Sequence, residues 1–188
     1  MLKQRIITAL ILLPIALCGF FLLDGSGFAL FIGLVVTLGA WEWARLAGFV
    51  NQLPRVAYAA VVALLLFFMY ILPDIAPWVL GAAVLWWALA TFLVLTYPRT
   101  SGQWSSVACK LVIGLAILLP AWQGLVEIKR YPLGNELILA AMVLAWGADI
   151  GAYFSGRAFG KRKLAPAVSP GKSWEGVYGG LALTLLIT

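Results

Sequence analysis

The sequence predicts an all-α protein, a polytopic transmembrane helical bundle with about seven apolar segments. Hydrophobic residues make up 64% of the 188 residues and charged residues only 11%, and the mean hydropathy is +1.03. A soluble domain is about half apolar and about a quarter charged. Several apolar runs exceed about 18 residues, the length at which a helix crosses roughly 30 Å of hydrocarbon. This composition excludes a soluble globular domain.

The apolar segments follow one another along the chain. Gly, Pro, Asn and Asp residues interrupt the apolar runs at 24–27, 51–54, 73–74, 98–102 and 132–135. The first segment lacks the small-residue cleavage site of a secretory signal, so we predict a retained transmembrane helix. The segments are 6–23, 28–46, 56–72, 78–97, 107–126, 137–155 and 174–188.

The domain organisation follows from this pattern. We expect a single transmembrane domain over residues 1–188, with a cytoplasmic basic loop over residues 156–173. The last apolar segment would span about 22 Å as a helix, which is less than a full crossing. We therefore expect this segment to be incomplete and the parent polypeptide to continue past Thr188.

The positions of lysine and arginine predict the orientation in the membrane. With the N-terminus in the cytoplasm, only Lys129 and Arg130 of the 13 cations fall outside, as the positive-inside rule requires. Loops held against an anionic inner leaflet explain the net charge of +6 without a nucleic-acid partner. The cytoplasmic cations are Lys3, Arg5, Arg45, Arg55, Arg99, Lys110, Arg157, Lys161, Arg162, Lys163 and Lys172.

Asp149 is the candidate for chemistry inside the apolar segments. It lies in the sixth segment, in the half of the bilayer nearer the cytoplasm. An ionised carboxylate there needs a cation, which can be a lysine, an arginine or a metal ion. Its neighbours are small and allow close approach of another backbone or of a ligand. A structural hydrogen bond between helices is the alternative to a functional role.

The basic loop after this segment is a candidate anion site. Residues 157–173 contain five of the 13 cations. We predict that Ser173 caps the seventh helix and that Glu175 lies in its first turn. The segment from Ser169 to Ser173 thus presents hydroxyls, Lys172 and a helix N-terminus, a combination that suits a phosphate. An ordinary positive-inside loop is the alternative.

Other features are predicted to be structural. Glu42 precedes Arg45 by three residues, a spacing at which the two side chains can form an ion pair. The pairs Gly156/Gly160 and Gly176/Gly180 are typical of helix packing or turns. We expect no disulfide, because Cys18 and Cys109 lie toward opposite membrane surfaces.

The block from Asp149 to Gly176 combines an acid, small residues, cations and serines, and it resembles the phosphatidate cytidylyltransferase family, also called CDP-diacylglycerol synthases. The start of the chain, with Lys3 and Arg5, and the segment 40–43 are similar to bacterial members too. The residues of the block that carry the resemblance are Asp149, Gly151, Ala152, Tyr153, Gly156, Arg157, Gly160, Lys161, Lys163, Leu164, Ala165, Pro166, Ser169, Pro170, Gly171, Lys172, Ser173, Glu175 and Gly176.

The resemblance implies an integral enzyme of the bacterial inner membrane. Such an enzyme joins CTP and phosphatidic acid, releases pyrophosphate, forms CDP-diacylglycerol, works as a homodimer and uses a divalent metal, usually Mg²⁺. Asp149, Lys172 and Ser169 would line its polar site. The resemblance also implies that most metal-binding aspartates belong to a Lys- and Asp-rich stretch C-terminal to this block.

Nucleotidyl transfer gives each candidate residue a role. We predict that Lys172, Arg157, Lys161 and Lys163 contact phosphates, because cations must neutralise the leaving pyrophosphate. Ser169 and Ser173 would donate hydrogen bonds, and Asp149 would hold the metal or position a lysine. The alternatives are an ion-coupled transporter with Asp149 as its cation or proton site, and an inactive membrane fragment that lacks the C-terminal metal site.

Overall fold

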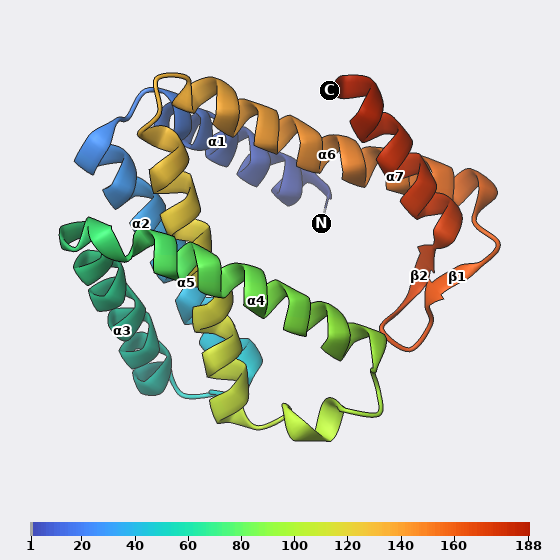
Figure 1. Ribbon diagram of the computed structural model, residues 1–188, viewed down its shortest axis with the longest axis horizontal. Helices are drawn as coiled ribbons and strands as arrows, with labels where there is room; N and C mark the ends of the chain where they lie inside the picture. The colour runs from blue at the N-terminus through green and yellow to red at the C-terminus, as the bar shows by residue number, and fades with distance from the viewer. Residues whose placement is uncertain (1) are drawn as a thin grey trace. The chain divides into compact units, whose positions relative to one another are not determined.

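The computed structural model describes the backbone of residues 2–188 and the side chains of residues 10–188, so the side chains of Lys3 and Arg5 lie outside the described residues. Each apolar segment forms one α-helix, which confirms the helical fold (Figure 1). The helices are α1 (Leu2–Phe21), α2 (Gly25–Ala47), α3 (Gln52–Ile71), α4 (Ala76–Leu95), α5 (Val107–Lys129), α6 (Gly134–Phe159) and α7 (Trp174–Ile187), with short 3-10 helices at Pro73–Ile75 and Ser101–Gln103.

The described helices include five stretches that are long and apolar enough to cross a membrane. Two other apolar stretches are shorter, namely Leu10–Phe21 of α1 and the whole of α7. The chain is therefore a multi-pass membrane protein. The five long stretches are Gly25–Ala47, Gln52–Ile71, Pro73–Leu95, Val107–Lys129 and Gly134–Phe159.

The basic segment differs from the predicted loop. Helix α6 continues to Phe159, and the chain then forms an antiparallel hairpin of β1 (Lys163–Ala165) and β2 (Ser169–Ser173). Lys163 lies opposite Ser173, and Ala165 lies opposite Ser169. The physical reason is that a segment between two helices still needs partners for its amides and carbonyls, and pairing the two halves of the segment supplies them. The all-α expectation missed this small sheet.

The chain divides into two compact units. The first comprises Met1–Trp86 and Ser105–Asn135, and the second comprises Trp87–Trp104 and Glu136–Thr188. The core of the first unit is formed by α2, α3 and α5, where Phe28, Val62 and Trp122 are buried. The indole N–H of Trp122 donates to the carbonyl of Ala29 at 3.0 Å, so even this buried polar group is paired.

Helix α5 is held in the first unit through its own carbonyl groups. Trp43 Nε1 donates to the carbonyl of Lys110 at 2.7 Å, and the Tyr58 hydroxyl donates to that of Leu111 at 2.8 Å. Gly114 makes this approach possible, because a Cβ there would lie 2.6 Å from the Tyr58 hydroxyl oxygen. The two side chains therefore join α2 and α3 to one turn of α5.

Glu42 forms the predicted pair with Arg45 and a second one with Arg55. The Arg45 pair is long, at 3.9 Å, and the Arg45 side chain is 67% exposed. Arg55 is only 7% exposed and lies 3.2 Å from Glu42. It also donates to the carbonyl of Trp41 and lies 3.8 Å above the Trp41 ring. The buried arginine, which sequence spacing did not reveal, therefore links α3 to α2, whereas the weaker Arg45 pair lies within α2.

Lys129 links three parts of the first unit at the C-terminus of α5. Its side chain is 4% exposed and lies 3.3 Å from Asp24. The ammonium donates to the carbonyl of Phe20 at 2.8 Å and to the side chain of Asn135, and it lies 4.9 Å from the Phe28 ring. Lys129, which the sequence predicted to lie outside the membrane, is thus a buried side chain that connects the ends of several helices.

In the second unit, small residues bring α6 and α7 into backbone contact. Figure 1 shows α7 in red beside the C-terminal half of α6 in orange. A Cβ at Gly151 would lie 2.5 Å from the carbonyl oxygen of Gly179, and one at Gly180 would lie 2.8 Å from that of Ala148. Gly176 likewise faces Ala152. The predicted role of Gly176 and Gly180 in helix packing is confirmed. The small residues near Asp149 lie against the backbone of α7.

We expect Gly179→Ala to destabilise the second unit by about 1–3 kcal/mol, because overpacking a close contact forces the backbones apart. The added methyl group would lie 2.6 Å from the Ser155 hydroxyl oxygen and 2.8 Å from the Gly151 carbonyl oxygen. Thermal unfolding of the detergent-solubilised protein measures the change. The control is Gly81→Ala, since Gly81 is also helical and nothing lies within 4 Å of its added Cβ. Equal melting temperatures for the two variants would contradict the prediction.

Candidate functional site

Helix α6 carries a polar stripe along part of its surface. Asp149, Tyr153 and Arg157 follow one another at intervals of four residues, which places them on one face of the helix. Arg157 donates a hydrogen bond to the Tyr153 hydroxyl oxygen at 3.0 Å. Asp149 lies about 12 Å before Arg157 along the helix axis. The helix thus leads from an acid within the apolar segment to a cation at its C-terminal end.

Asp149 is exposed on the surface of α6. Among the residues that the structure describes, it has no hydrogen-bond or ion-pair partner, and no group of three or more His, Cys, Asp or Glu side chains gathers to hold a metal ion. Asp149 can therefore supply one carboxylate ligand. Mg²⁺ is commonly held by one or two carboxylates together with substrate phosphates, so a single carboxylate fits this mode of binding.

The hairpin presents lysines close to the start of α7. Lys161 precedes β1, Lys163 lies in β1 opposite Ser173, and Lys172 lies next to Ser173 in β2. The Ser173 side chain is buried, whereas these three lysine residues are exposed. None of the three ammonium groups has a carboxylate partner among the described residues. Three positive charges are therefore available to an anionic ligand at the base of the hairpin.

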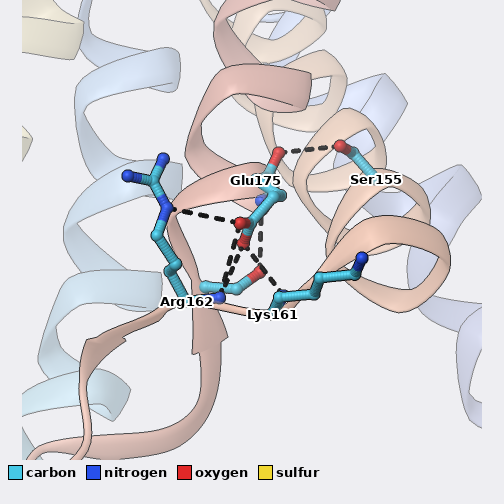
Figure 2. Close-up of polar contacts among 6 residues, drawn as sticks. Ser155, Lys161, Arg162 and Glu175 are labelled. Carbon is cyan, nitrogen blue, oxygen red and sulfur yellow. Dashed lines mark hydrogen bonds and ion pairs between the residues drawn. The ribbon is translucent and has the colours of Figure 1, made fainter.

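Glu175 binds the chain at the start of the hairpin (Figure 2). Its carboxylate accepts hydrogen bonds from the amide of Lys161 at 3.1 Å and from the amide of Arg162 at 3.2 Å. The Arg162 guanidinium lies 3.5 Å from the same carboxylate. Hydrogen bonds from its own amide and from those two amides lower the pKa of the Glu175 carboxyl group. Glu175 therefore stays ionised and fixes the position of the hairpin.

Two serines tie the same region to the helices. The Ser173 hydroxyl accepts a hydrogen bond from the amide of Gly176 at 3.2 Å, which confirms the predicted N-cap. The Ser155 hydroxyl of α6 donates to the carbonyl of Glu175 at 2.7 Å. Because the Ser173 oxygen is buried and used in capping, its predicted contact with a phosphate stays a prediction.

The predicted site residues lie in three places within the second unit. Lys161, Lys163, Lys172 and Ser173 lie together at the base of the hairpin. Ser169 begins β2, about 13 Å from Ser173 along an extended strand. The other two lie on α6, as described above. A ligand that used all of them would have to extend from the hairpin along the helix.

Sequence reasoning missed the structural roles of four residues that organise this region. Tyr153 could have been found from its spacing of four residues to Asp149 and Arg157. Glu175 was placed in the first turn of α7, but its bonds to residues 13 and 14 positions earlier have no local pattern. No local pattern predicts the contacts of Ser155 or Arg162 with Glu175 either. Because the charge of Arg162 is paired with Glu175, it is less available to a ligand than the charges of the neighbouring lysines.

The comparisons with known proteins agree on one family. The sequence pattern of the cytidylyltransferase family matches residues 3–188. The phosphatidate cytidylyltransferase of Pseudomonas aeruginosa is 71% identical over 182 residues, which cover 97% of this chain and 67% of that protein. Those of Haemophilus influenzae and Bacillus subtilis are 38% and 28% identical, and the matches cover 71% and 69% of their lengths and 100% and 98% of this chain. No solved structure matches the chain.

We expect Tyr153→Phe to weaken the binding of inorganic pyrophosphate about fivefold, because the loss of one hydrogen bond of about 1 kcal/mol leaves Arg157 less well oriented. Titration calorimetry on the detergent-solubilised protein measures the affinity. Tyr131→Phe is the control, since Tyr131 is exposed and its hydroxyl has no partner among the described residues. Similar affinities for the two variants would exclude a role for the Tyr153 hydroxyl.

Proposed function

The chain belongs to the cytidylyltransferase family, and on that premise we propose that it transfers the cytidylyl group of CTP to phosphatidic acid. The products are CDP-diacylglycerol and pyrophosphate, so the reaction serves phospholipid biosynthesis. The relatives from Pseudomonas aeruginosa and Haemophilus influenzae are both named phosphatidate cytidylyltransferases. The observation that carries the proposal is the group of exposed lysines on a fixed hairpin next to a membrane helix.

The reaction joins two polyanions. A phosphate oxygen of phosphatidic acid attacks the α-phosphorus of CTP, and a new P–O bond forms there. The bond between the α-phosphorus and the oxygen that bridges to the β-phosphorus breaks, and pyrophosphate leaves with the electron pair. Such a displacement depends on alignment of the reacting groups and on positive charges that neutralise the leaving group.

The hairpin lysines suit the triphosphate. We assign Lys161, Lys163 and Lys172 to the phosphates of CTP, since their ammonium groups have no carboxylate partner among the described residues. Arg157 would contact a phosphate from the end of α6, oriented by the Tyr153 hydroxyl. Ser169 would donate a hydrogen bond near the hairpin turn. Ser173 would support the site by capping α7, with a direct phosphate contact as the alternative.

Asp149 is the residue that we propose for a divalent metal, Mg²⁺ in the usual case. When bound, the metal would neutralise charge on the triphosphate and on the leaving pyrophosphate. Asp149 lacks a partner of its own among the described residues, which leaves its carboxylate available. Its place in the C-terminal half of α6, toward Arg157 and the hairpin, also suits a lipid substrate whose phosphate lies at the cytoplasmic membrane surface.

The family membership and the cation pattern support a proposal for the location and the assembly. We propose the cytoplasmic membrane of a bacterium, with the N-terminus and the hairpin in the cytoplasm, where CTP is present. We also propose a homodimer, as the sequence resemblance implies. Nucleic acid has no part in this function, and family membership favours group transfer over an ion-coupled transporter.

We expect Lys172→Ala to reduce kcat/KM for CTP about 100-fold, the usual scale for losing one preorganised donor to a developing charge. Labelled CTP and phosphatidic acid, added to membranes that hold the full-length protein, measure the formation of labelled lipid. The control is Lys110→Ala, another lysine without a carboxylate partner among the described residues, on α5. Unchanged activity in Lys172→Ala would remove this residue from the site. Ion flux without CTP-dependent lipid labelling would overturn the proposed function.

We expect Asp149→Asn to raise the Mg²⁺ concentration for half-maximal activity about tenfold or more, because a neutral amide is a weaker ligand for a hard cation. The same lipid-labelling assay, run across a series of Mg²⁺ concentrations, measures the shift. Asp74→Asn is the control, since Asp74 is an exposed acid in the turn before α4. An unchanged Mg²⁺ dependence would exclude Asp149 as a metal ligand.

A further inference from the structure

We propose that Glu175 is a positioning residue that fills the anion-binding backbone at the base of the hairpin. By doing so, it holds the lysines in place for substrate phosphates. This inference rests on the proposed function for its catalytic consequence, but its structural part stands on the geometry of the second unit alone.

The site that Glu175 occupies resembles a binding site for an anion. Two successive amides, those of Lys161 and Arg162, point at its carboxylate, and the Arg162 guanidinium approaches from the side (Figure 2). Successive amides of this kind commonly bind phosphates, and a nearby guanidinium strengthens the binding. Here an internal carboxylate takes that place, and its side chain is only 22% exposed. A substrate phosphate would have to displace Glu175 to reach these amides.

Ordinary helix capping does not account for this arrangement. A capping box requires a Glu or Gln at the third helical position after the N-cap. With Ser173 as the N-cap, the third position is Gly176, and Glu175 is at the second. An acid in the first turn also interacts favourably with the helix dipole, but that interaction requires no bonds to residues 13 or 14 positions earlier. The contacts with Lys161 and Arg162 therefore need a reason of their own.

The reason lies in the position of Glu175 where α6, the hairpin and α7 meet. Its carboxylate holds the chain that enters β1, and its carbonyl accepts the hydrogen bond from Ser155 of α6. Next to it, the amide of Trp174 donates to the carbonyl of Arg162 at 2.9 Å. One residue thus fixes the start of the hairpin against its end and joins both to the preceding helix.

This arrangement divides the cations of the hairpin between two tasks. Arg162 is paired with Glu175, so its charge serves the fold. Lys161 contributes its amide to Glu175, while its side chain extends away from the carboxylate in Figure 2. Glu175 already accepts the hydrogen bonds of the amides of Lys161 and Arg162. A phosphate that approaches the hairpin therefore meets the lysine side chains and not these amides. Without Glu175, a phosphate could bind the amides instead and lie out of line for transfer.

Trypsin cleavage tests the structural part. In membranes that hold the full-length protein, we expect Glu175→Ala to raise the rate of cleavage after residues 161–163 about tenfold, the effect of losing one charge-assisted hydrogen bond. Sodium formate should restore resistance by filling the vacated site, whereas sodium chloride at the same ionic strength should not. The control is Glu136→Ala, which removes an exposed acid from the first turn of α6. If Glu175→Ala does not accumulate, Glu175→Gln is measured in the same way.

The lipid-labelling assay tests the catalytic part. We expect Glu175→Ala to lower kcat/KM for CTP at least tenfold, and formate to restore part of it. Cleavage at the wild-type rate, or cleavage that formate does not slow, would overturn the positioning role. Faster cleavage with unchanged kcat/KM would overturn its importance for the reaction. If the wild-type protein shows no CTP-dependent labelling, the proposed function fails, and the cleavage experiment still decides the role of Glu175.

Discussion

The interior of a bilayer offers no hydrogen-bonding partners, and this constraint governs both units of the protein. Each buried polar group discussed above is paired within its own unit. Trp122 bonds the carbonyl of Ala29, Arg55 is held by Glu42 and by the ring and carbonyl of Trp41, and Lys129 is held by Asp24 and the carbonyl of Phe20. In each case the partners come from different helices. For these three side chains, satisfying the polar group also joins two helices.

The same constraint shapes the second unit in a different way. Helices that pack in hydrocarbon gain little from excluding water, so close contact of their backbones becomes important. Gly151 and Gly179 permit that contact between α6 and α7. The polar segment between the two helices pairs its own backbone by forming a hairpin and by bonding to Glu175. The tight helix pair holds the two ends of the hairpin close together.

A lipid-modifying nucleotidyltransferase needs a polar site that a water-soluble and a membrane-bound substrate can both reach. In the proposed function, the hairpin lysines would bind the soluble nucleotide, while α6 extends from them toward the hydrocarbon and carries Asp149. The Tyr153–Arg157 hydrogen bond lies between these two parts. Charge is concentrated where phosphates would meet, and the cations used for folding, such as Arg162, are paired with acids.

The sequence by itself determined the seven helices, the Ser173 cap, the Glu42–Arg45 pair and the region of the candidate site. These features depend on apolar length, on spacing within a few residues or on local capping chemistry, and each of these can be recognised in a short stretch of sequence. Only the tertiary structure decided that Arg55 is the closer partner of Glu42, that Lys129 is buried, and that Glu175 binds the amides of Lys161 and Arg162. Those partners are 13 or more residues apart in every case. These residues come into contact because helices pack together and a hairpin forms. No local sequence pattern predicts such contacts.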